Sequence, residues 1–426
     1  MRLSELSPIV VLTFSLCLGV GSVATANVPA ETNLGLTETD CQEFAERLTR
    51  AVEKGDVGAC SELFDENGII DSFFEGIDFG PNNREQMIAK WKQGFLANHV
   101  LFQPLVTNCA LGGSFRFAAA RPNSTKGQLV MRSLSPQGAA GYQVLTLARR
   151  GDGKFVINDA HSMSSAGPST LEIVRATVSH FTRFDGPDGK IRPDAPNAEK
   201  LVMDKRVLSG IFQSYAKQDY SSVCYYYTRL SPELQNDRLA MLLMLNAAVQ
   251  IKSNPVPPGI PVKPEEMEAK RNDFIKSKIE QYRATYPDDS AIELAATSFY
   301  LNTRQYAAAI SSVDSFEKSI GNDPYLNVLR AQIYLLDDNV KRAAATADDA
   351  LEKLPDMSAA YEVALDVAVR AGNNDRAITI LDQMRGRFGG ELSDGLKSDP
   401  KMKEFLGSPE YLEWKSKSKS VNKTDP

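Results

Sequence analysis

Residues 324–357, PYLNVLRAQIYLLDDNVKRAAATADDALEKLPDM, form the middle copy of a 34-residue periodicity in the second half of the chain. Alanine occupies the same place in three successive copies, at Ala309, Ala343 and Ala377. Apolar residues recur at the same interval at Tyr300, Tyr334 and Ala368, and at Phe316, Ala350 and Met384. A period of this length predicts helix pairs that stack on one another, because one pair alone cannot bury its apolar face.

This spacing resembles that of the tetratricopeptide repeat family, with units at 290–323, 324–357 and 358–391. The tryptophan and glycine of that family's first helix are largely missing, so the likeness rests on spacing. The resemblance implies an all-helical solenoid over 198–415, whose groove binds a protein or peptide. Its remaining parts are expected as a helix pair at 198–232, helices at 238–252 and 265–286, a proline-rich insertion at 253–264, a cap at 392–414 and a disordered tail at 416–426.

The first half of the chain opens with helical signals. Thr39 and Gln42 have the spacing of a capping box, in which each side chain accepts a free backbone N–H. Gly55 is expected to end this helix, and Asp56 is a good N-cap for a second, short one. A short strand or turn is expected at 68–71 and a third helix at 83–98.

After the third helix the apolar period changes to two, which is typical of strands. Five strands are expected, at 100–107, 114–121, 127–134, 141–149 and 154–162. Their short, turn-rich connections make neighbouring strands antiparallel. Val144 and Leu145 are adjacent in the fourth of them, which indicates that both faces of the sheet are partly apolar.

Helices followed by such a sheet resemble the NTF2-like (SnoaL-like) cone fold, and the stretch AVEKGDVGACSELFDENGIID at 51–71 resembles its first helices. The expected fold class is therefore an α+β cone-like domain at 38–183 followed by the helical-repeat solenoid. A helix at 169–184 is an addition to the minimal cone. The Gly, Pro and Asp residues of 184–197 predict a linker between the two domains.

The N-terminus has the pattern of an export signal. The apolar run PIVVLTFSLCLGV at 8–20 is too short to span a bilayer, and Ala24-Thr25-Ala26 follows it as a cleavage motif. We expect residues 1–26 to be a cleaved signal peptide, residues 27–37 to be a linker, and the protein to be periplasmic or extracellular; the alternative is an uncleaved anchor. The mature chain then keeps Cys41, Cys60, Cys109 and Cys224, either in one of three disulfide pairings or as buried thiols.

Composition and motifs exclude several classes of function. The 426 residues carry a formal net charge of -6 and no basic block, which argues against nucleic-acid binding. The sequence has no phosphate loop, no dinucleotide-binding glycine motif, no H-E-x-x-H and no C-x-x-C, and only three histidines. We therefore expect neither a cofactor nor a metal site, and no membrane span after signal cleavage.

One group of residues could support catalysis. Phe155, Ile157, Asp159 and His161 are spaced to share one strand face, where Asp159 could orient His161 as a general base. Asp71 and Tyr142 could join them in a cone pocket. This alternative, a small-molecule binder or SnoaL-like enzyme, requires Asp159 and His161 to be buried together. Otherwise the pair lies at the edge of the sheet or holds the following loop in place.

The leading hypothesis is an exported, non-enzymatic interaction protein. Its helical groove would bind a protein or peptide, and the cone-like domain would serve as a second docking module. Asn327, Arg330 and Glu362 are the expected partner-binding residues, as exposed polar positions on first helices of the repeats. Reversing the charge of Arg330 is expected to abolish capture of the partner without unfolding the domain.

Overall fold

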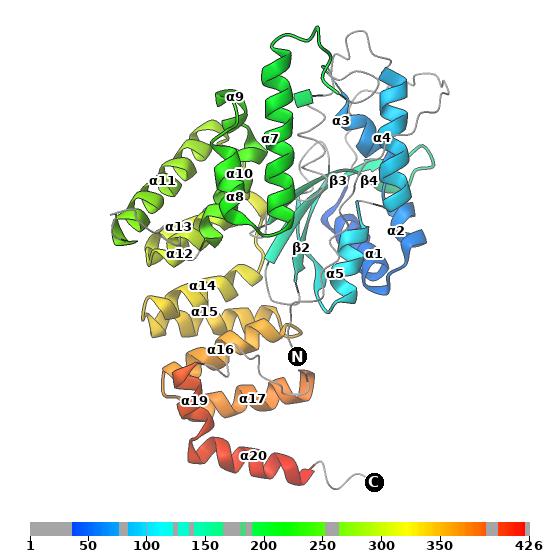
Figure 1. Ribbon diagram of the computed structural model, residues 1–426. Helices are drawn as coiled ribbons and strands as arrows, with labels where there is room; N and C mark the ends of the chain where they lie inside the picture. The colour runs from blue at the N-terminus through cyan, green and yellow to red at the C-terminus, as the bar shows by residue number, and fades with distance from the viewer. Residues whose placement is uncertain are drawn as a thin grey trace. The chain divides into compact units, whose positions relative to one another are not determined.

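The structure is a computed structural model of the chain, in which two compact units meet between Ala295 and Ala296. Each unit is described by itself (Figure 1). The structure describes residues 36–75, 84–99, 101–121, 127–135, 140–164, 180–181, 184, 190–251, 264–388 and 399–421. The predicted signal peptide and most of the linker after it, most of the helix predicted at 169–184 and nearly all of the insertion at 253–264 lie outside these residues. None of the described helices is both long and apolar enough to cross a membrane.

Helix α1 (Glu38–Lys54) begins one turn earlier than the capping box at Thr39 predicts. The N-cap is Thr37, whose side chain accepts the Asp40 N–H, while the Asp40 carboxylate accepts the Thr37 N–H at 2.9 Å. Asp40 therefore does what was expected of Gln42, and the Thr39 prediction is wrong. Gly55 ends the helix as predicted, at a φ of 65° that favours glycine.

Two segments predicted as strand or turn are helices. Asp56 caps α2 (Val57–Leu63) as expected, but residues 68–71 lie inside α3 (Glu66–Phe73), which the Asp65 side chain caps through the Gly68 N–H. The strand predicted at 100–107 is also wrong, because most of it lies in α5 (Gln103–Ala110), which has a proline in its first turn. Helix α4 (Arg84–Asn98) confirms the third predicted helix. Short apolar runs have no decisive period, and a cap or an N-terminal proline turns them into helices.

The sheet has four antiparallel strands in the order β1-β2-β3-β4. Their bounds are Ser114–Arg121, Gln128–Leu134, Ala140–Arg149 and Phe155–Ser164, which confirms the last four of the five predicted strands to within two residues. Side chains from α1, α2, α3 and α5 pack with one face of the sheet in a single core. The other face is apolar as well, since Val144 and Leu145 are both buried.

The rest of the first unit is helical. The predicted helices are confirmed at α10 (Arg238–Gln250) and α11 (Pro264–Thr285). Residues 198–232 form α7 (Ala198–Ala216) and α8 (Tyr220–Tyr227), followed by the short α9 (Pro232–Gln235). The linker predicted at 184–197 lies within this first unit, before α7.

The second unit contains successive helix pairs. Helix α12 (Ala291–Asn302) crosses into it from the first unit, and the following helices are α13 (Tyr306–Ile320), α14 (Tyr325–Leu336), α15 (Val340–Lys353), α16 (Ser358–Arg370) and α17 (Asn374–Phe388). The second helices of the pairs begin at Tyr306, Val340 and Asn374, 34 residues apart. The alanines of the sequence period at 309, 343 and 377 are fully buried.

Two helices end the chain, α19 (Pro400–Leu406) and α20 (Pro409–Val421). They contact α16 and α17 respectively. The Trp414 indole N–H donates to the Asp382 carboxylate of α17 at 2.7 Å. The prediction of a disordered tail from residue 416 is therefore wrong as far as Val421, because α20 continues to that residue.

All four cysteines among the described residues are free thiols. Burial raises the pKa of Cys60 and of Cys224 to about 11. Cys60 has no exposed surface, and the Cys224 Sγ lies 4.0 Å from the Met244 carbonyl oxygen.

We expect iodoacetamide at pH 8 to leave Cys60 and Cys224 unmodified in the native protein, since only about a thousandth of such a thiol is the reactive thiolate. Peptide mass spectrometry measures the modification, and the urea-denatured protein serves as the control. Equal labelling of native and denatured protein would contradict this assignment.

Candidate functional site

Arg330 does not have the exposure expected of a partner-binding residue. Only 11% of its side chain is exposed, and its Nη2 lies 2.7 Å from Asp314 Oδ1 and 2.6 Å from Glu317 Oε2 on α13. Its Nη1 also donates to the Asn327 side-chain oxygen. The expectation that Arg330 is an exposed groove residue is wrong, because its charge is used to join α14 to α13.

The other two expected groove residues, Asn327 and Glu362, are only partly exposed. The Asn327 side-chain amide donates to Asp349 of α15. On α14 the exposed positions are instead Gln332 and Leu336, and 53% of Leu336 is exposed.

Asp159 and His161 pair as expected, with His161 Nε2 3.2 Å from Asp159 Oδ2. Their side chains are 32% and 44% exposed, however, so they do not form a buried pair. The expectation that they share a face with Phe155 and Ile157 is wrong. Between the ladder pairs Thr146–Asp159 and Leu147–Ile157 the strand has one extra residue, and this bulge reverses the alternation of side chains.

As a result, Phe155 and Ile157 pack in the helix-covered core, as does Ala160, while Asp159 and His161 lie on the opposite face. Tyr142 is fully buried on that opposite face, opposite Met163 in the ladder. Asp71 lies apart from them on α3, half-exposed and 2.8 Å from the Lys92 ammonium. The structure thus brings together Asp159 and His161 and leaves Asp71 outside the group.

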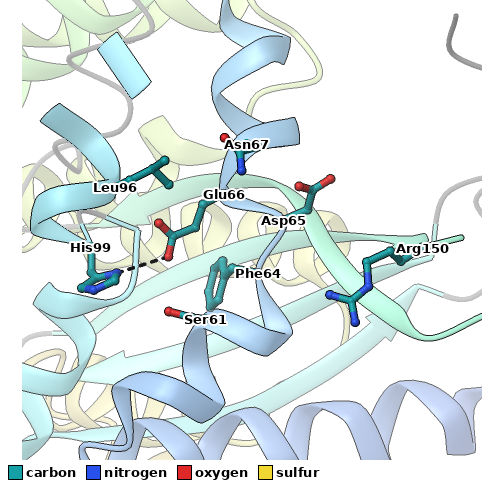
Figure 2. A pocket seen from close by; sticks show the side chains of 8 residues that line it. All are labelled: Ser61, Phe64, Asp65, Glu66, Asn67, Leu96, His99 and Arg150. Carbon is teal, nitrogen blue, oxygen red and sulfur yellow. Dashed lines mark hydrogen bonds and ion pairs between the residues drawn. The ribbon is translucent and has the colours of Figure 1, made fainter. Parts of the chain in front are cut away.

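A pocket that the sequence did not indicate lies in the helical layer beside α3 (Figure 2). It has a volume of ≈ 340 Å³, opens to solvent and is lined by Ser61, residues 64–67, Leu96, His99 and Arg150. These come from α2, from the junction of α2 and α3, from the end of α4 with the residue after it, and from the turn between β3 and β4.

The junction between α2 and α3 is held by the sheet. The Asp65 N–H donates to the Ile157 carbonyl of β4 at 2.8 Å, and Phe64 forms a parallel bridge with the same residue. The Asp65 carboxylate caps α3 through the Gly68 N–H. Glu66 is therefore presented as the first residue of α3, from a backbone fixed at both sides.

His99 is held opposite Glu66. Its backbone has a φ of 45°, uncommon for a residue with a side chain, and its carbonyl accepts the Gln103 N–H at the start of α5. The imidazole stacks on buried Phe102 at 5.1 Å between ring centroids, and its Nδ1 lies 3.4 Å from Glu66 Oε1. Figure 2 shows Glu66 and His99 facing each other.

Glu66 is a buried carboxyl, with 8% of the residue exposed. Burial raises the pKa of Glu66, and the contact with His99 opposes this change without cancelling it. At the other end of the pocket, the hydrogen bond from Arg150 lowers the pKa of Asp152 to about 2, and the two side chains lie 2.7 Å apart. Arg150 is thus already neutralised by a neighbour.

Sequence reasoning missed this pocket. Glu66 and His99 are 33 residues apart, on elements that no local pattern pairs, and the segment at 68–71 was expected to be strand or turn. The one available signal was the left-over histidine just beyond a predicted helix. Within the described residues, no cluster of three or more His, Cys, Asp or Glu side chains could hold a metal ion.

Comparison with protein-family models, with curated proteins and with solved structures found no match to this chain.

Proposed function

We propose that this chain is an exported, non-enzymatic interaction protein whose second unit binds a protein or peptide partner. The observation that carries the proposal is the series of helix pairs whose second helices begin 34 residues apart. Such pairs expose one edge of every helix to solvent, and extended partners bind along surfaces of this kind.

The same observations support the finer proposal of tetratricopeptide-like units. The buried alanines at 309, 343 and 377 lie where small residues allow helices to approach, and α14 contacts both α15 and the next first helix, α16. For the first unit we propose an NTF2-like domain that acts as a second docking module. The helices that cover one face of its antiparallel sheet support this assignment.

The proposed binding surface differs from the one expected from sequence. It consists of Gln332 and Leu336 on α14 with Glu362 and Asp366 on α16, two helices in contact. Leu336 is the apolar side chain at this surface that remains 53% exposed. An apolar residue of the partner would cover it, and burial of such a side chain contributes about 1.5–3 kcal/mol.

The test uses Leu336→Asp in the full chain, with capture of partners from the native envelope fraction followed by quantitative mass spectrometry. We expect the captured partner to decrease at least about tenfold, because the substitution removes an apolar contact and places a charge in its position. Leu412→Asp on α20 is the matched control, because Leu412 is 52% exposed.

Both variants should keep the circular dichroism spectrum and melting temperature of the wild type within the small range of exposed substitutions. A partner lost equally with both variants, or retained with Leu336→Asp, would contradict the proposed surface.

A further inference from the structure

We propose that the pocket beside α3 binds a small organic molecule carrying a protonated amine, with the Glu66 carboxylate as its counter-ion. This site is separate from the proposed docking surface, which lies in the second unit. Its ligand class follows from the charge of the pocket, from the incomplete pairing of Glu66 and from the apolar walls.

The pocket favours a cation. Asp65 and Glu66 contribute two carboxylates to its lining, and the guanidinium of Arg150 is the cation opposed to them. That guanidinium is already paired with Asp152 at 2.7 Å. The Asp65 and Glu62 carboxylates raise the pKa of Arg150 further, after the larger effect of Asp152, so a negatively charged ligand would meet several acidic groups at that end.

Glu66 is buried more completely than its partner compensates. The contact between His99 Nδ1 and Glu66 Oε1 is 3.4 Å, longer than the 2.7–2.9 Å of a strong charge-assisted hydrogen bond. In the part of the chain that the structure describes, the second carboxylate oxygen of Glu66 has no hydrogen-bond partner. A buried carboxylate with one weak partner gains from an ammonium donor more than an exposed one does.

His99 can take part as an acceptor. When Nδ1 carries the proton and faces Glu66, Nε2 presents a lone pair, and no described residue bonds to that atom. The ring is fixed by stacking on Phe102, so the ligand does not have to order it. An ammonium group has three N–H donors and could use both His99 and Glu66.

Apolar walls suit the carbon part of the ligand. Phe64 and Leu96 line the pocket, and Figure 2 shows the Phe64 ring between the Glu66–His99 side and the Arg150 side. An aromatic ring also attracts a cation placed over its face. The volume of ≈ 340 Å³ lies at the lower end of the range for small-molecule pockets.

The experiment titrates the full chain with three probes of similar shape: 2-phenylethylamine, 2-phenylethanol and 3-phenylpropionate. Isothermal titration calorimetry at pH 7.5 should detect the amine and find the alcohol and the acid at least about tenfold weaker, because a charged hydrogen bond is lost in both. Equal affinity for amine and alcohol, tighter binding of the acid, or no detectable amine binding at millimolar concentration would overturn the proposal.

The variant Glu66→Gln keeps the shape of the side chain and removes its charge. We expect it to weaken amine binding at least about tenfold, whereas Glu62→Gln, an exposed neighbour outside the pocket lining, should leave the affinity unchanged. An unchanged affinity in Glu66→Gln would place the amine elsewhere and reject the site.

A second measurement covers the case in which Glu66→Gln does not fold. The chain has three histidines, so their imidazole Hε1 resonances in the wild type can be followed by NMR and assigned by single replacements. The amine should shift the resonance of His99 and leave those of His161 and His180 in place. A shift confined to His161 or His180 would overturn the assignment.

Discussion

Replacing Arg330 by glutamate should destabilise the second unit by about 3–5 kcal/mol, the usual cost of breaking a buried ion pair. The Arg330 side chain is 11% exposed and bonds to both Asp314 and Glu317. A glutamate in its place would put a third carboxylate beside these two. Because a domain is stable by only about 5–15 kcal/mol, the loss is large enough to unfold much of the unit.

Urea unfolding followed by circular dichroism measures this change. Lys341→Glu is the control, since Lys341 is an exposed residue of α15 whose charge reversal should alter stability by less than about 0.5 kcal/mol. An Arg330→Glu protein as stable as wild type would show that the pairs with Asp314 and Glu317 are not maintained. Loss of partner capture by this variant would therefore report unfolding, contrary to the expectation from sequence.

Replacing Asp289 by asparagine should have a similarly large effect on the first unit. Asp289 lies between α11 and α12, where its carboxylate pairs with Arg238 of α10 and accepts the Tyr282 hydroxyl of α11. Its other oxygen accepts the Ala291 N–H at 2.9 Å, at the start of α12. Removing the charge leaves a largely buried guanidinium without its partner, at about 3–5 kcal/mol.

The effect of Asp289 should depend on pH. Burial alone would raise the pKa of Asp289, but the hydrogen bond and charge of Arg238 outweigh it and hold the pKa below its usual range. The folded state therefore binds this proton less readily than the unfolded state does. The contribution of Asp289 is complete above the ordinary aspartate pKa of about 3.9 and disappears as the pH falls through its lower folded value.

Urea unfolding of the wild type and of Asp289→Asn at several pH values between 3 and 7 measures both effects. The difference should be largest near neutral pH and should shrink below about pH 4. Asp288→Asn, at the exposed neighbouring position, should match the wild type throughout. A difference between Asp289→Asn and wild type that does not change with pH would rule out the charge as its cause.

The long helices and their spacing could be predicted because they depend on many residues of one chain segment. The start of α15 follows from the same apolar period as the start of α17, and an error at one position changes neither. The strands from 114 onward were also predictable, since turn-rich segments separate them and each has a period of two. Short segments were not, and α3 and α5 show that one capping contact or proline decides between helix and strand.

The candidate site was not predictable for a different reason. Asp159 and His161 were correctly paired because they are two residues apart on one strand, but a single extra residue before them moved the pair to the other face of the sheet. Glu66 and His99 come together only when α3 and the end of α4 pack side by side. No pattern within either segment encodes that contact.

The amino-acid order alone therefore specified a helical second half with a 34-residue repeat and an antiparallel sheet in the first half, because backbone hydrogen bonding and the burial of apolar stripes act between near neighbours. Packing between distant segments decided which polar side chains are available. It used the charge of Arg330 to join two helices, left Leu336 exposed, and buried Glu66 in a pocket beside His99. The exposure and partner of a charged side chain depend on what lies across from it, and that is set by the three-dimensional arrangement of the elements.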